Sequence, residues 1–331
     1  MRPISYARVT SVADAIATVS ADPGNAFLAG GTNEVDLLRL DVVRRSGLVD
    51  INSLPLDWIE DLPDGGLRIG ALARMSDVAE APAVVERFPM VAQALVLGAS
   101  AQLRHMASIG GNLLQRVRCS YFRDVGSPCN KRDPGTGCSA LDGINRGHAI
   151  LGTSEKCIAT HPSDLAVALV ALDAVVHTQG PRGERAIPVD DFFLLPGDTP
   201  EREHPIDHGE LIVAVEVPAT PVARRSLYLK VRDRESYEFA LASVAAAVRV
   251  DRGAIAEARL ALGGVATKPW RARIAEGVLV GAPAQRETFE RAAREELRPA
   301  VPRRSNAFKL ELAQRAIVRA LETAVAIGGG A

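Results

Sequence analysis

The sequence is poor in aromatic residues and contains no long apolar run. Phenylalanine, tyrosine and tryptophan make up only 4% of the 331 residues, so small aliphatic side chains must fill the interior. The longest apolar stretch, residues 165–176, contains Asp173 and is too short to cross a bilayer. The first residues, MRPISYARVT, lack the continuous apolar segment of a signal peptide. We therefore expect a soluble globular protein without membrane insertion, cytoplasmic by its own sequence.

The chain also lacks an excess of either charge. Its 39 basic residues are balanced by 40 acidic residues, and no long run of like charge occurs. Proteins that bind nucleic acid or anionic membranes usually carry a basic patch or stripe. We therefore expect no nucleic-acid partner.

Familiar catalytic motifs are missing as well. The sequence has no GxSxG, HExxH, P-loop or kinase signature, and its six histidines are scattered along the chain. No Ser, His and acid arrangement can be singled out. The chain thus offers no obvious substrate-transforming site of its own, which points towards a bound redox cofactor.

The length allows two domains, and the periodicity indicates an α+β fold. A helix is predicted at residues 11–20, an apolar run at 26–29 and a glycine turn at 30–33. A helix at 34–41 and a strand at 48–51 follow, which indicates early βαβ character. Next come a predicted hairpin at 58–72 and two helices interrupted by prolines at 75–100. A helix at 163–172 and strands at 175–178 and 211–217 complete the first domain.

A proline-rich connector, residues 218–221, predicts the boundary between a first domain, 1–218, and a second domain, 222–331. The second domain is predicted to be an antiparallel sheet with helices. Its strands are expected at 227–231, 243–250 and 257–262, and its helices at 285–297 and 308–326.

Two glycine pairs stand out in the first domain. One lies in LAGGTNE at 28–34, and the other lies in ASIGGNL at 107–113, with Arg104 just upstream. Glycine permits backbone conformations in which consecutive amide N–H groups surround a pyrophosphate. Either pair alone can be an ordinary tight turn, and neither matches the GxGxxG of NAD-binding proteins. Together they suggest two loops that hold the phosphates of one dinucleotide.

All four cysteines fall in one irregular stretch and its exit. Residues 115–156 lose hydrophobic periodicity, and a long structureless stretch inside a domain indicates a function. Cys119, Cys129, Cys138 and Cys157 are separated by nine, eight and eighteen residues. Four thiolates suit a 4Fe-4S cluster or a tetrahedral zinc ion. The spacing favours iron-sulfur because the paired CxxC of zinc ribbons is absent, and it leaves zinc, disulfides and free thiols open.

These motifs resemble the FAD-binding subunits of the xanthine dehydrogenase and carbon monoxide dehydrogenase family over essentially the whole chain. AGGTNE at 29–34 and SIGGN at 108–112 look like the two phosphate loops of that family. The stretch with RCSYFRD, SPCNKRDPGTGC and EKCIATHPSDL is similar to the flavin subunits of bacterial periplasmic aldehyde oxidoreductases and, more distantly, of 4-hydroxybenzoyl-CoA reductases. YLKVRDRESYEFAL at 228–241 and LGGVATKPWRA at 262–272 strengthen the likeness to aldehyde oxidoreductases.

The resemblance implies a two-subdomain FAD-binding fold of the vanillyl-alcohol-oxidase (PCMH) type, with the cysteine stretch, about 115–158, as an insertion. It implies a C-terminal domain of the carbon monoxide dehydrogenase flavoprotein type. Gly98 stands where some relatives place an aromatic residue on the flavin, so the flavin's exposure does not carry over.

The resemblance also implies which residues contact the cofactors. For FAD these are Ala29, Gly30, Gly31, Thr32, Asn33, Ser108, Ile109, Gly110, Gly111, Asn112, Asp164, Ile212 and Lys230. Glu34 and Arg104, which flank the two glycine pairs, complete the predicted set. Asp164 would reach the sugar or phosphate side, and Ile212 and Lys230 would lie near the isoalloxazine ring. From the residues alone, Asp164 suits a helix cap beside Ser163, and Lys230 suits a solvated strand lysine. The resemblance makes Cys119, Cys129, Cys138 and Cys157 the ligands of a 4Fe-4S cluster.

The implied function is electron transfer, with no catalytic residue in this chain. A large molybdenum-cofactor subunit would oxidise an aldehyde, a small 2Fe-2S subunit would relay the electrons, and FAD would pass them to an external acceptor. The complex would be a heterotrimer or a dimer of heterotrimers, and a signal-bearing partner could carry it to the periplasm. The alternatives are a stand-alone flavin oxidase and a zinc-stabilised scaffold without enzymatic activity.

Overall fold

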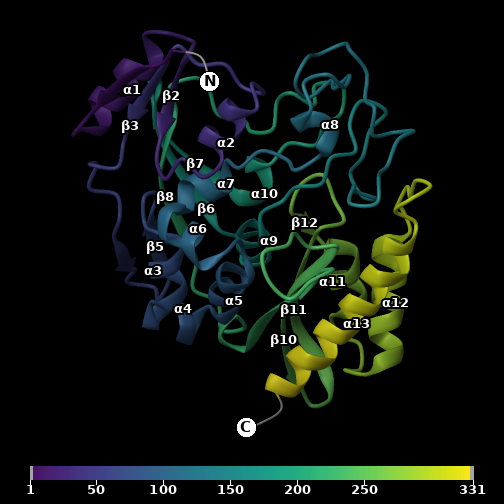
Figure 1. Cartoon of the computed structure of the whole chain (residues 1–331). Helices are drawn as coiled ribbons and strands as arrows, with labels where there is room; N and C mark the ends of the chain where they lie inside the picture. The colour runs from purple at the N-terminus through teal and green to yellow at the C-terminus, as the bar shows by residue number, and fades with distance from the viewer. Residues whose placement is uncertain (1–2, 329–331) are drawn as a thin grey trace.

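The computed structural model describes residues 3–328, so residues 1–2 and 329–331, at the outer ends of the two predicted domains, lie outside it. Figure 1 shows two regions beside each other: strands and short helices of the first part of the chain, and a sheet covered by helices of the last part. The cysteine stretch lies at the upper right, in teal, next to both regions (Figure 1).

The N-terminal region is a small parallel α/β unit. Its sheet has the order β1-β3-β2, with β1 at Ser5–Arg8, β2 at Asn25–Leu28 and β3 at Gly47–Asp50. Two helices connect the strands, α1 at Val12–Ser20 and α2 at Glu34–Arg39. The hydroxyl of Ser11 accepts a hydrogen bond from the Asp14 backbone N–H, which caps α1 as the sequence predicts.

The second subdomain contains a five-stranded antiparallel sheet of order β4-β5-β8-β6-β7. Its strands are β4 Ile59–Asp61, β5 Leu67–Gly70, β6 Val175–Gly180, β7 Gly183–Pro188 and β8 Leu211–Val217. Its helices are α3 Met75–Glu80, α4 Pro82–Arg87, α5 Pro89–Leu97, α6 Ala101–Met106, α7 Ile109–Leu113, α9 Asp164–Ala171 and α10 Val189–Phe192. Because β5 pairs with β8, segments about 150 residues apart meet in this sheet, and the cysteine stretch lies between them in the sequence.

The C-terminal region is an antiparallel sheet of order β12-β11-β10-β9, with β9 at Ser226–Val231, β10 at Ala242–Asp251, β11 at Ala254–Gly263 and β12 at Trp270–Arg271. Helices α11 Arg273–Leu279, α12 Arg286–Leu297 and α13 Phe308–Gly328 follow, and α13 packs along β10 (Figure 1). A short 3-10 turn, η1 at Ala223–Arg225, precedes the sheet. The α+β class and the antiparallel C-terminal sheet expected from the sequence are confirmed.

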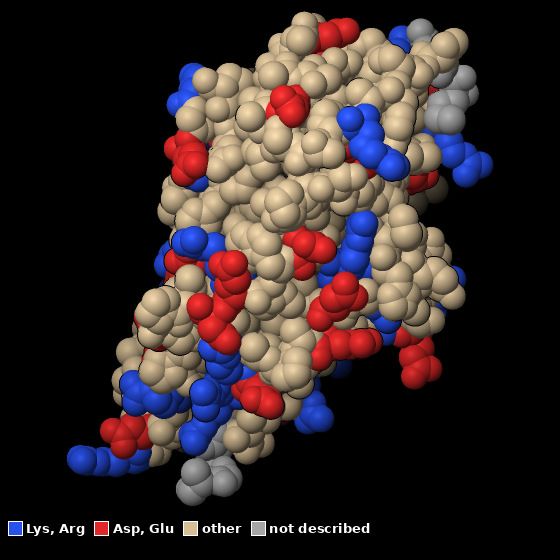
Figure 2. Space-filling model, turned by 90° about the vertical axis from the view of Figure 1, so that its left-hand side faces the viewer, with Lys and Arg blue, Asp and Glu red and all other residues tan. Residues whose placement is uncertain are grey.

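The surface shows no broad area of one charge on the face in Figure 2, where acidic and basic side chains alternate. Among the described residues, no helix is both long and apolar enough to span a membrane.

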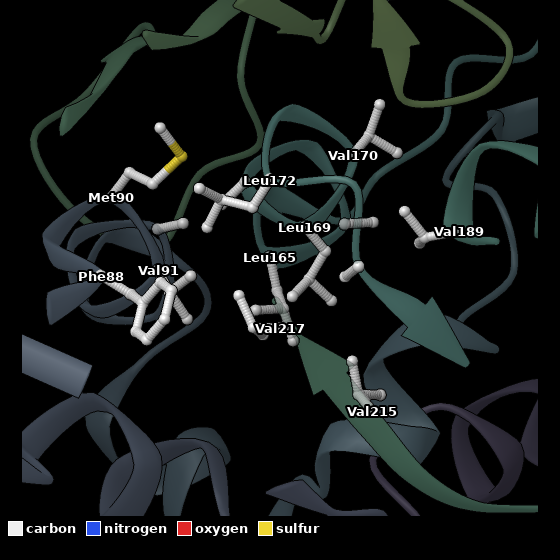
Figure 3. Close-up of a cluster of buried hydrophobic side chains, with 14 of the residues drawn as sticks. Phe88, Met90, Val91, Leu165, Leu169, Val170, Leu172, Val189, Val215 and Val217 are labelled. Carbon is white, nitrogen blue, oxygen red and sulfur yellow. The ribbon is translucent and has the colours of Figure 1, made fainter. Parts of the chain in front are cut away.

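Helix α9 is the centre of the largest core. All eight of its residues are buried, as expected for a helix that is apolar on every side apart from Asp164. Figure 3 shows Leu165, Leu169 and Leu172 facing Phe88, Met90 and Val91 at α5, with Val215 and Val217 of β8 nearby. The helix also contacts β10 and β11, so it joins the first part of the chain to the C-terminal sheet.

The structure differs from the sequence prediction in several elements. Residues 75–100 contain three helices where two were predicted, because Pro82 and Pro89 each begin a new helix at its first turn. Several short elements were not predicted: β1, α6, α7, α8 at Ser120–Arg123, β7, α10, β12 and α11. Four of these, α6, α7, α8 and α10, are helices of six residues or fewer, too short for a clear periodic signal.

Candidate functional site

The first glycine pair lies between β2 and α2. A Cβ atom on Gly30 would come within 1.8 Å of the Met106 carbonyl oxygen, so the backbones of the two segments touch there. Gly31 has φ +70°, a conformation that favours glycine. The turn is therefore pressed against the segment that leads into the second glycine pair.

The second glycine pair lies at the start of α7. The Ser108 hydroxyl accepts a hydrogen bond from the Gly111 N–H at 3.2 Å, and the Gly110 N–H donates to the Ala71 carbonyl at 2.8 Å. A Cβ atom on Gly110 would lie 3.0 Å from the Ala71 Cβ. Close backbone packing thus holds this turn as well.

Both glycine turns line one cavity of about 310 Å³, named here the glycine cavity. The predicted residues on its wall are Ala29, Gly30, Gly31, Thr32, Asn33, Glu34, Ser108, Gly110, Gly111 and Ile212. Ile109 packs in the core, and Arg104 donates to the Gly98 carbonyl, so neither of them belongs to this wall.

Asn33 supplies an unused donor at the glycine cavity. Its side-chain oxygen accepts a hydrogen bond from the Arg116 N–H at 2.9 Å, whereas its Nδ2 is buried without a partner. A buried donor without a partner costs about 1–3 kcal/mol, which an acceptor oxygen of a ligand would recover. Glu34 is paired with Arg45 at 2.7 Å, so its negative charge is compensated at the cavity wall.

Asp164 and Lys230 lie together in a second place, between α9 and the C-terminal sheet. The Lys230 Nζ is 2.7 Å from Asp164 Oδ2, and the Tyr228 hydroxyl donates to Asp164 Oδ1 at 2.7 Å. The Lys230 side chain is only 1% exposed, so it is not a solvated strand lysine. Burial raises the pKa of Asp164 above its ordinary value, against the opposing effect of Lys230.

Asn112 and Ser163 connect these two places. The Ser163 hydroxyl donates to the Asn112 side-chain oxygen at 2.6 Å and accepts from the Ala166 N–H at 3.0 Å as the N-cap of α9. An interdomain cavity of about 350 Å³ begins at Asp164 and reaches Cys119, with Arg118, Arg146 and Phe239 on its wall. The Asn112–Ser163 hydrogen bond therefore links the second glycine pair to the cavity that reaches the cysteine stretch.

The four cysteines surround one small cavity, named here the cysteine cavity. Cys129 and Cys138 face each other across an antiparallel bridge, and none of the four forms a disulfide within the described chain. The His148 Nε2 is 3.1 Å from the Cys119 sulfur. Burial raises the pKa of Cys119 to about 12 and that of Cys157 to about 11, so these two thiols stay protonated near neutrality.

Comparisons with known proteins agree along the whole chain. The family model described as the FAD binding domain in molybdopterin dehydrogenase matches residues 2–220, and the model for the CO dehydrogenase flavoprotein C-terminal domain matches residues 227–324. The chain belongs to the FAD-binding subunits of the molybdenum hydroxylase family. Members of this family are oxidoreductase subunits.

Individual relatives of the family cover nearly all of the chain. The aldehyde oxidoreductase FAD-binding subunit PaoB of Escherichia coli is 48% identical, over 98% of this chain and 99% of that protein. The carbon monoxide dehydrogenase medium chain of Hydrogenophaga pseudoflava is 26% identical, over 96% of each chain. A solved structure of carbon monoxide dehydrogenase from Hydrogenophaga pseudoflava superimposes with a TM-score of 0.77 at 25% identity, over 99% of both chains.

The glycine cavity fits the dinucleotide that gives the family its name. The unused Asn33 Nδ2 offers a donor for a phosphate or ribose oxygen, and the glycines of both turns leave the wall free of side chains. The Gly110 and Gly111 N–H groups are already bonded to Ala71 and Ser108, so the second turn contributes room rather than free N–H donors. Residues that the motifs did not reveal also line it, chiefly Arg45, Arg116 and the segment 206–211. No sequence motif identifies these residues, because they are far from the glycine pairs in the sequence and reach the cavity only in the folded chain.

The cysteine cavity has the four sulfur donors that an iron-sulfur cluster needs, but it is at present too narrow to hold the cluster. Four thiols and the apolar side chains of Phe122, Ala140 and Ala159 surround a space of about 10 Å³, roughly room for one water. Within residues 3–328, no three His, Cys, Asp or Glu side chains are placed to hold a single metal ion. The thiols would have to move apart to take up a larger group.

Three histidines, His148 buried and His161 and His204 partly exposed, are expected to make the stability of this region depend on pH. Burial lowers the pKa of His161 to about 3 and the pKa values of His148 and His204 to about 4. In the unfolded chain these histidines bind a proton near pH 6.5, whereas in the folded chain they stay neutral down to about pH 4. Their contribution to the unfolding free energy is therefore complete above pH 6.5 and is lost as the pH falls towards 4. Between pH 7 and pH 5, the unfolding free energy should fall by about 2 kcal/mol for each histidine.

Urea unfolding of His161→Gln at pH 7 and pH 5 tests this expectation. The variant should lose less stability between the two pH values than the wild type, by about 2 kcal/mol. His105→Gln, which changes an exposed histidine, should behave as the wild type does. An unchanged pH dependence in His161→Gln would show that the side chain titrates normally.

Proposed function

We propose that this chain is the electron-transferring subunit of a heteromeric, molybdenum-dependent aldehyde oxidoreductase, with FAD in the glycine cavity and a 4Fe-4S cluster in the cysteine cavity. The observation that carries the proposal is the convergence of two glycine turns, some 80 residues apart in the chain, on one cavity wall. The predicted domains, 1–218 and 222–331, would clasp the flavin from two sides.

The residues of the glycine cavity would bind and orient FAD. The turns at Gly30–Gly31 and Gly110–Gly111 would surround the two phosphates, and Asn33 would donate to one of them. Ser163 and Asn112 would fix the turn at α7 relative to Asp164. Asp164 and Lys230 would face the sugar and ring side, with Ile212 on the ring. FAD supplies two-electron and one-electron redox chemistry, so no acid or base of this chain is needed.

The cysteine cavity supports an iron-sulfur cluster by its donor set. Cys119, Cys129, Cys138 and Cys157 would each bind one iron, and their thiols would release protons on binding. His148 would remain beside Cys119, with its Nε2 3.1 Å from the sulfur. A cluster held there would supply one-electron redox chemistry.

The substrate class and the partners rest on the relatives. The 48% identity to an aldehyde oxidoreductase subunit over nearly the full length supports an aldehyde as the substrate of the complex. Relatives named as FAD-binding subunits and medium chains support a large molybdenum-cofactor subunit and a small 2Fe-2S subunit as partners, in a heterotrimer or a dimer of heterotrimers. An external acceptor would take the electrons. The compartment, cytoplasmic by this sequence or periplasmic with an exported partner, stays a prediction.

Quantifying FAD, iron and acid-labile sulfide in anaerobically purified protein tests the proposal. We expect about four irons per FAD, falling sharply in Cys129→Ser while FAD stays bound. Ser120→Ala, on the short helix beside Cys119, serves as the matched control and should keep its iron.

Other outcomes would identify the alternatives. Flavin without iron would leave a plain flavin subunit, and colourless protein with one zinc would indicate a scaffold. Turnover of a substrate by the isolated chain would indicate a stand-alone flavin oxidase.

A further inference from the structure

Glu203 lies between the glycine cavity and the cysteine cavity and pairs with a cation from each. Its carboxylate contacts the Arg116 guanidinium on one side, and its Oε1 is 3.2 Å from the Lys131 Nζ on the other. The side chains of Glu203 and Lys131 are 16% and 7% exposed, so water screens these charges little. The three side chains are named here the Glu203 bridge.

Arg116 is the end of the bridge at the glycine cavity. It lines that cavity, and its backbone N–H donates to the Asn33 side chain at 2.9 Å. Its guanidinium stacks over the Phe122 ring, 4.9 Å from the centroid. Phe122 in turn lines the cysteine cavity, so Arg116 lies between the glycine cavity and the cysteine cavity.

Lys131 is the end of the bridge at the cysteine cavity. It lines that cavity together with all four cysteines and stands two residues after Cys129. Its Nζ also donates to the Pro200 carbonyl at 2.6 Å. The lysine therefore places its positive charge at the wall of this cavity.

The charges of the bridge do not cancel. Two cations share one carboxylate, which remains ionised because Arg116 and Lys131 lower its pKa by more than burial raises it. His161 and His204 stand beside the bridge, and burial keeps both neutral near pH 7. The net positive charge at the wall of the cysteine cavity therefore depends on the pairing of Glu203 with Lys131.

We propose that Glu203 is a positioning residue that holds Arg116 at the flavin site and sets the positive charge that Lys131 presents to the iron-sulfur cluster. This inference rests on the proposed function, because it requires a cluster on the four cysteines. Reduction adds one negative charge to the cluster. Removing the negative charge of Glu203 leaves the positive charge of Lys131 less neutralised, which should stabilise the reduced cluster. Removing Lys131 should destabilise the reduced cluster.

Redox titration of the cluster, followed by electron paramagnetic resonance in the full-length loaded chain, tests the inference. In Glu203→Gln the ratio of reduced to oxidised cluster at a fixed potential should rise about tenfold, a midpoint shift of about +59 mV for one electron. Lys131→Met should shift the midpoint in the opposite direction by a similar amount. The double variant should return close to the wild type.

Glu201→Gln is the matched control, because it removes the same charge from an exposed neighbouring side chain. It should leave the midpoint unchanged. Equal midpoints in the wild type, Glu203→Gln and Lys131→Met would overturn the inference and leave the cluster in place. A wild-type chain without iron would overturn the cluster and the inference together. If Glu203→Gln fails to fold, the downward shift in Lys131→Met decides the question.

Discussion

Gly30→Ala should lose FAD affinity about 10-fold to 100-fold while the chain still folds. The added methyl group would lie 1.8 Å from the Met106 carbonyl oxygen, so one of the two backbone segments must move. Overpacking of this kind costs about 1–3 kcal/mol, and each 1.4 kcal/mol is about tenfold in affinity. Because the two segments lead into the two glycine turns, the displacement falls on the cavity that we assign to FAD.

The measurement is FAD titration into the flavin-free chain, with circular dichroism to confirm the fold. Gly277→Ala is the control, since a Cβ at Gly277 in α11 meets no atom within 4 Å. It should bind FAD as the wild type does and gain about 0.5–1 kcal/mol of stability, because alanine suits a helix better than glycine. Unchanged FAD affinity in Gly30→Ala would place the flavin elsewhere.

Asp164→Ala should lower the unfolding free energy by about 3–5 kcal/mol, the usual cost of leaving a buried charge without its partner. Lys230 is 1% exposed and would retain the Leu97 carbonyl as its hydrogen-bond acceptor. The Tyr228 hydroxyl would keep its contact with Ser243. The loss should be visible as a lower urea midpoint of the flavin-free chain, so it does not depend on the cofactor.

Two further variants separate the buried charge from other effects. Replacing both members, Asp164→Leu with Lys230→Met, should recover much of the lost stability because no unpaired charge remains. Asp233→Ala removes a carboxylate from a pair with Arg146 in which both side chains are about half exposed, and it should change stability little. A double variant no more stable than Asp164→Ala would show that packing, and not charge, accounts for the loss.

The sequence predicted the regular elements where local signals are strong. Helix α1 begins after its Ser11 cap, and β8 spans the residues predicted from its apolar run. The glycine pairs could be recognised because glycine at a tight turn is a local requirement. The α+β class followed from the same alternation of elements.

The sequence could not predict what depends on packing between distant segments. Nothing local shows that Lys230, on a strand, is buried against Asp164, which is 66 residues away. The same holds for Arg116 and Lys131, which share Glu203 across more than 70 residues. Proline was read as a helix interruption in residues 75–100, although Pro82 and Pro89 each start a helix.

The number of electrons that the chain accepts tests the central claim most directly. In an anaerobic reductive titration of the purified chain, we expect about three electrons per molecule, two for FAD and one for the cluster, with separate changes in the flavin and iron-sulfur absorption. Uptake of about two electrons with flavin bleaching alone would contradict the cluster, and no uptake would contradict the electron-transfer function altogether.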